Sequence, residues 1–112
     1  ITMSRGEPWT EVENEVIVDA YFAMLDLELA KKPFVKAEVR RELQAGALSK
    51  RSRGSIEFKM QNISGVLEDY EQLWIEGYKP MVNYQSELEQ AVVAKLRGRG
   101  TDLPAKHVRE RG

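Results

Sequence analysis

Apolar residues recur at the three- and four-residue spacing of an α-helix in four stretches, and this pattern constrains the fold more than any other feature. The clearest stretch carries Ile56, Met60, Ile63 and Leu67, which would share one face of a helix. The sequence therefore predicts an all-α domain: a compact bundle of about four helices with a helix-turn-helix-like arrangement and an ordered aromatic loop before the last helix.

A capping box and a proline delimit the first predicted helix. Thr10 stands three residues before Glu13, a spacing that lets each side chain cap the other's backbone N–H. The helix is expected to run to about Ala30, because Pro33 lacks the N–H needed to continue it. A second helix is predicted over about 35–45.

The third predicted helix begins at an N-cap, Ser52. Gly65 lies opposite its apolar stripe, where a smooth helix surface permits close approach, so we expect burial on more than one side. The aromatic loop follows and contains a turn at 76–80. Asn83 is the predicted N-cap of the last helix, which ends at Gly98.

The chain is expected to form one folded domain with a short extension at each end. Its 112 residues are 42% hydrophobic and 31% charged, which suits a single globular core. We interpret 1–8 as a leader or expression remnant, 9–97 as the helical domain, and 98–112 as a basic linker toward a missing downstream domain. No apolar run approaches the roughly 20 residues of a membrane-spanning helix, so no membrane contact and a cytoplasmic location are expected.

The composition argues against catalysis and metal binding in this segment. The chain has no cysteine, and its one histidine, His107, lies in the polar tail. A serine nucleophile would need a neighbouring base and an orienting group, and no Gly-x-Ser-x-Gly turn occurs. We therefore expect no enzymatic activity, no cofactor and no metal in this segment.

Charge is segregated along the chain although the net charge is only −1. Seven acids and no bases occur over 7–28, whereas 31–59 holds nine bases against three acids, a net +6. Residues 68–89 are acidic again, and the tail from Lys95 is basic. A folded chain could therefore present one basic and one acidic face.

The start of the third predicted helix is the candidate functional site. The free N–H groups and dipole of a helix start attract anions, so Arg51, Arg53 and Lys59 would neutralise phosphates. Gln61 or Asn62 would read base edges, because amides pair with adenine in the major groove. The predicted nucleic-acid-binding set is Arg51, Ser52, Arg53, Ser55, Lys59, Gln61, Asn62, Tyr78 and Lys79.

Several of these residues have a second interpretation. Bases before a helix are often only solvated, and Asn62 equally suits a buried amide that bonds the backbone of 77–80. For the aromatic residues, packing is favoured over base stacking. The rival function is a protein-interaction or oligomerisation domain that uses the acidic first helix, with Trp74 and Tyr78 as anchors. A third is a flipped-base pocket in the aromatic loop.

Five segments carry a resemblance to a known family. They are Trp9-Thr10-Glu11-Val12-Glu13, Tyr21-Phe22-Ala23-Met24-Leu25, residues 51–64, Gly77-Tyr78-Lys79-Pro80 and Asn83-Tyr84-Gln85. Together, over about 9–96, they resemble an N-terminal module of predicted bacterial HNH-type restriction endonucleases and related defence nucleases. A Trp that opens the first helix and a third helix entered through Arg51-Ser52-Arg53-Gly54-Ser55 are also similar to Myb/SANT-like helix-turn-helix domains.

The resemblance implies a non-catalytic DNA-binding module for target recognition or positioning in a larger restriction or defence nuclease. Cleavage would reside in a C-terminal nuclease domain in cis, downstream of Gly112, because this segment has no His-Asn-His cluster. The whole protein would then be an HNH-type or related endonuclease. Double-stranded DNA is the expected partner, and a homodimer is compatible with this prediction.

Overall fold

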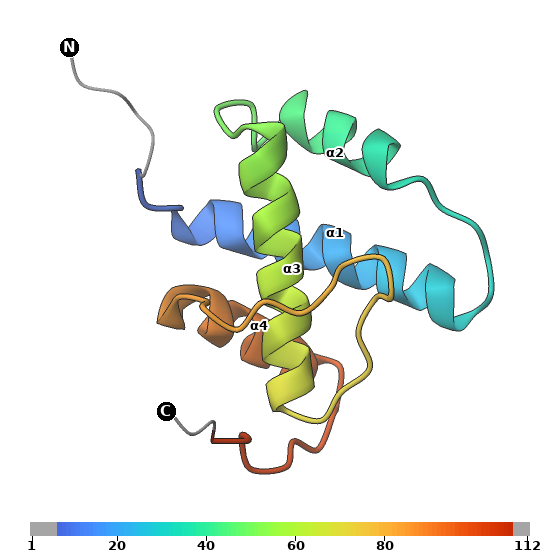
Figure 1. Ribbon diagram of the computed structural model, residues 1–112, viewed down its shortest axis with the longest axis vertical. Helices are drawn as coiled ribbons and strands as arrows, with labels where there is room; N and C mark the ends of the chain where they lie inside the picture. Colours follow the sequence, from blue (N-terminus) through green and yellow to red (C-terminus); the bar gives the residue numbers. More distant parts are fainter. Residues whose placement is uncertain (1–6, 109–112) are drawn as a thin grey trace.

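Four helices account for the regular structure of the chain. The computed structural model describes residues 7–108, and within that range no strand occurs. The helices are α1 (Glu11–Leu29), α2 (Lys36–Gln44), α3 (Arg53–Asp69) and α4 (Ser86–Gly98), arranged as shown in Figure 1. The predicted all-α fold is confirmed.

Side-chain caps begin two of the helices where the sequence predicts them. Thr10 Oγ1 accepts from the Glu13 N–H at 3.1 Å, and Glu13 Oε1 accepts from the Thr10 N–H at 2.9 Å, which completes the capping box of α1. Ser52 Oγ accepts from the Ser55 N–H at 3.1 Å and begins α3. The prediction for the last helix is wrong, because its N-cap is Gln85 rather than Asn83.

Helices α1 and α3 each end in a turn with one residue in the left-handed region. Lys31 and Glu71 have φ of 60° and 58°. The N–H of the residue after each of them bonds a carbonyl in the last turn of its helix. The Lys32 N–H bonds the Leu27 carbonyl at 2.8 Å, as in a Schellman motif. This turn, rather than Pro33, ends α1.

Helix α3 is the central element of the domain. It crosses α1 in Figure 1, and it contacts both α1 and α4. Its residues Ile63, Val66 and Leu67 are fully buried, and so is Ser64 on another face. The expectation that this helix is buried on more than one side is confirmed, and apolar burial around it supplies the main driving force for folding.

An extended segment crosses α3 at Gly65 and is bound there through its backbone. A Cβ atom at Gly65 would lie 2.8 Å from the Met81 carbonyl carbon, so only glycine leaves room for the chain. Met81 donates its N–H to the Gln61 carbonyl, and its own carbonyl accepts from Asn62 Nδ2, each at 3.0 Å. Because the chain stays extended through this crossing, α4 starts two residues later than predicted.

The aromatic loop between α3 and α4 is anchored by a tyrosine of α1. Tyr21 Oη lies 2.6 Å from Ser64 Oγ and accepts from the Ile75 N–H at 2.9 Å. Its ring centroid lies 6.0 Å from that of Tyr78. Burial raises the pKa of Tyr21 to about 12, so its hydroxyl stays protonated at any physiological pH. The loop is ordered because it bonds to the core.

Both flanks of the expected domain pack onto it. Leu103 contacts the core, the His107 N–H bonds the Asp69 carbonyl at 2.7 Å, and Lys106 pairs with Glu89 at 3.1 Å. At the other end, the carbonyls of Glu7 and Pro8 accept from Arg51. Residues 1–6 of the expected leader and 109–112 of the expected linker lie outside the described residues.

Replacement of Gly65 by alanine is expected to destabilise the domain by about 1–3 kcal/mol, because the added methyl group would push the backbone at Met81 away from α3. Urea unfolding measures this change. Gly54→Ala is the matched control, since a Cβ there meets nothing within 4 Å. Gly54→Ala should change the free energy of unfolding by less than about 1 kcal/mol, in the direction of greater stability. Equal effects of the two substitutions would show that the crossing does not constrain the fold.

Candidate nucleic-acid interface

The predicted site begins at the N-terminus of α3, where the two serines bond each other. The Ser52 hydroxyl caps the Ser55 N–H, and Ser55 Oγ donates to the Ser52 carbonyl at 3.2 Å. Arg53 is the first residue of the helix and is exposed, as is Gly54 after it. The N–H groups of these two residues precede the first hydrogen bond of the helix, which leaves them available to an anion.

Arg51 is committed to contacts inside the domain. Its guanidinium binds Glu13 through two bonds, Nε to Oε2 at 2.8 Å and Nη2 to Oε1 at 2.6 Å. It also donates to the carbonyls of Glu7 and Pro8 and lies 4.9 Å from the Trp9 ring centroid. With 12% of its side chain exposed, Arg51 fastens the start of α1 to the start of α3.

Lys59 and Asn62 lie inside the domain rather than on its surface. Lys59 is 7% exposed, and its Nζ lies 3.3 Å from Gln85 Oε1 and 5.2 Å from the Trp9 ring. Burial lowers the pKa of Lys59, and the nearby Arg51 charge lowers it further. Asn62 is 2% exposed and donates to the Met81 carbonyl, so it is a buried amide, as in the alternative interpretation. Its acceptor lies one residue beyond the predicted range 77–80.

The loop residues of the predicted set are divided between core and surface. Tyr78 is 3% exposed, and Lys36 Nζ lies 4.1 Å above its ring and donates to the Gly77 carbonyl at 2.9 Å. Lys79 is exposed beside it, and Gln61 on α3 is half-buried. Burial of Tyr78 leaves Trp74, itself half-buried, as the more accessible of the two expected docking anchors.

A hollow of about 460 Å³ between α2 and the start of α3 brings three cationic side chains together. Lys36 and Arg40 reach it from α2, and Arg53 and Gly54 reach it from α3. Among the residues that the structure describes, Glu57 is the one acid in its lining, and it pairs with Lys36 at 3.3 Å. The structure therefore joins Arg53 and Tyr78 of the predicted set with two further bases of the basic stretch 31–59, Lys36 and Arg40.

The ion pair between Arg51 and Glu13 should make stability depend on pH. The Arg51 guanidinium lowers the pKa of Glu13 from 4.5 to about 2. Because the folded-state pKa is the lower one, this stabilisation is complete above about pH 4.5 and is lost as the pH falls toward 2. We expect the free energy of unfolding to fall by about 1–2 kcal/mol over this pH range. The Glu13→Gln variant should not show this fall, because it has no carboxylate to protonate.

Urea unfolding at neutral pH and at about pH 3 measures this difference. The Arg51→Gln variant and the Glu13→Gln/Arg51→Gln double variant complete a cycle that isolates the coupling between the two side chains. A coupling energy that is unchanged at low pH would contradict the assignment.

Within residues 7–108, no group of three or more His, Cys, Asp or Glu side chains is placed to hold a metal ion, and no helix is long and apolar enough to cross a membrane. Comparison with family models, curated proteins and solved structures gave no match to this chain.

Proposed function

We propose that this domain is a non-catalytic module that binds the phosphate backbone of double-stranded DNA through the hollow between α2 and α3. The observation that supports this most is the meeting of Lys36, Arg40 and Arg53 at the exposed start of a helix of 17 residues. Phosphate contacts from cations and helix N-termini set the affinity and register of DNA-binding proteins.

The proposed contact is independent of base sequence. Asn62 is buried against Met81 and cannot reach a base edge without leaving the core. Exposed Arg41 and Lys50 lie on α2 and on the turn before α3, so they extend the basic surface beyond the hollow. Such a module would position a nuclease domain in the same chain on DNA, in line with the resemblance to restriction and defence nucleases.

Binding of a fluorescein-labelled random-sequence duplex, followed by anisotropy over a series of salt concentrations, tests the proposal. Affinity should fall steeply with salt, because bound phosphates release counterions. Arg53→Gln should weaken binding and reduce the salt slope by about one, and Arg40→Gln/Arg53→Gln should weaken it further. Arg51 and Lys59 are poor choices for this test, since their loss would disturb packing.

Arg97→Gln is the matched control, because Arg97 is also exposed but lies at the end of α4. It should leave both affinity and salt slope close to those of the parent protein. The proposal fails if the duplex does not bind at low salt, or if Arg53→Gln and Arg97→Gln have the same effect.

A further inference from the structure

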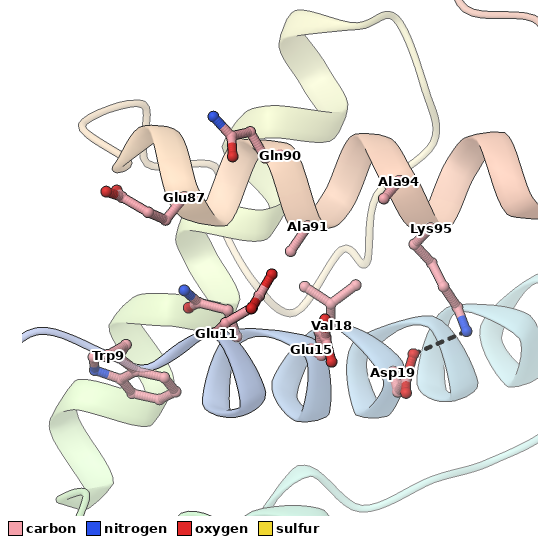
Figure 2. A pocket seen from close by; sticks show the side chains of 11 residues that line it. Trp9, Glu11, Glu15, Val18, Asp19, Glu87, Gln90, Ala91, Ala94 and Lys95 are labelled. Atoms are coloured by element: carbon pink, nitrogen blue, oxygen red, sulfur yellow. Dashed lines mark hydrogen bonds and ion pairs between the residues drawn. The ribbon is translucent and has the colours of Figure 1, made fainter.

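A second hollow of about 540 Å³ forms a groove between α1 and α4, away from the basic hollow. Figure 2 shows the two helices side by side, with Trp9 near one end and the pair of Lys95 and Asp19 toward the other. Each helix contributes five lining residues with the same spacing. They are Glu11, Asn14, Glu15, Val18 and Asp19 of α1, and Glu87, Gln90, Ala91, Ala94 and Lys95 of α4. This spacing makes a continuous ridge on either side.

The groove contains a buried acceptor for which the described part of the chain provides no donor. Asn14 lines it and is 2% exposed, and its Oδ1 has no hydrogen-bond partner among the described residues. A buried polar atom left without a hydrogen bond costs folding free energy, and such atoms are uncommon in native structures. A ligand that displaces the groups covering this atom and supplies an N–H donor to it would remove that cost.

The walls of the groove are acidic and its floor is apolar. Four carboxylates and one ammonium line it, a net charge of −3, and the ammonium of Lys95 already pairs with Asp19 at 2.9 Å. Val18, Ala91 and Ala94 provide small apolar side chains between the walls. A complementary ligand is therefore slender and apolar on one side and carries several cationic N–H donors.

We propose that this groove docks a basic amphipathic helix of a partner protein, with one arginine or lysine donating to Asn14 Oδ1. The alanines of α4 allow a third helix to approach closely, and the paired ridges guide it along the groove. Eight residues of ridge span about 12 Å, or two turns of the docked helix.

A second copy of this chain is a poorer occupant than a different protein. Its groove carries a net charge of −3, so a symmetric contact of groove with groove would be repulsive, and the cations that line the hollow between α2 and α3 lie on a different surface. A copy that docked by that basic end would leave its own groove open. Such a head-to-tail contact would extend into a filament unless its rotation closed a ring.

The probe is a fluorescein-labelled helical peptide with alanine and leucine on one face and arginine on the flanks. A control peptide carries glutamate in place of every arginine. Anisotropy with the full chain should rise for the arginine peptide, with an affinity that weakens as salt is added, and should not rise for the glutamate peptide.

Substitutions in the groove separate docking from folding. Glu15→Lys should weaken peptide binding roughly fivefold to tenfold, and Ala94→Trp should abolish it by filling the groove. Both residues are exposed, so thermal unfolding should change little. Asn14→Leu should raise Tm, because it removes an unsatisfied acceptor, and should weaken peptide binding at the same time.

Glu42→Lys is the control for net charge, because Glu42 is exposed on α2, outside the groove. It should leave peptide affinity unchanged, as should Arg53→Gln, which tests the DNA proposal separately. The docking proposal is overturned if the arginine peptide does not bind, or if Glu15→Lys and Glu42→Lys weaken binding equally. Sedimentation that shows a self-associated parent protein, made monomeric by Ala94→Trp, would overturn it in favour of a second copy.

Discussion

The binding of the extended chain across α3 is the constraint on which the rest of this structure depends. Met81 uses both polar groups of its backbone, one on the Gln61 carbonyl and one on the Asn62 amide, while Gly65 gives it room. This crossing covers a face of α3 that would otherwise be free, and it delays the start of α4. A recognition helix that enters the DNA major groove needs an open face. On α3 the exposed residues are Arg53, Gly54 and Phe58 in its N-terminal third and Glu68 near its other end, which leaves no open face along the helix.

Local chemistry made much of this fold predictable from sequence, whereas the site depended on distant pairings. The capping box at Thr10 and the N-cap at Ser52 each depend on residues within a few positions of one another. Gly65 indicated a close approach by itself, but not that Met81 would make it. The partner of Arg51 lies 38 residues away, and no periodicity indicates it. The burial of Lys59 was equally hidden, because its neighbour Trp9 comes from the other end of the domain.

The charge blocks of the sequence neutralise each other in part through ion pairs in the fold. Arg51 of the basic block meets Glu13 of the acidic first block, and the basic tail returns to α1 through Arg99 and Asp26, whose Nη2 and Oδ1 lie 2.6 Å apart. Adding the charges of each block along the sequence therefore overstates the electrostatic field of that block in the folded domain. Two hollows of opposite sign lie on different surfaces of the fold, so an anionic ligand and a cationic ligand could occupy them together without competing for the same residues.

The hydroxyl of Tyr21 has a consequence for how the domain opens. It holds the Ile75 amide of an irregular loop and contacts Ser64 of the central helix at the same time. The Ile75 N–H is thus shielded from water as thoroughly as a helical amide in the core. Its exchange with solvent deuterium should require the core to open, so this loop and the three helices around it would unfold as one cooperative unit instead of fraying separately.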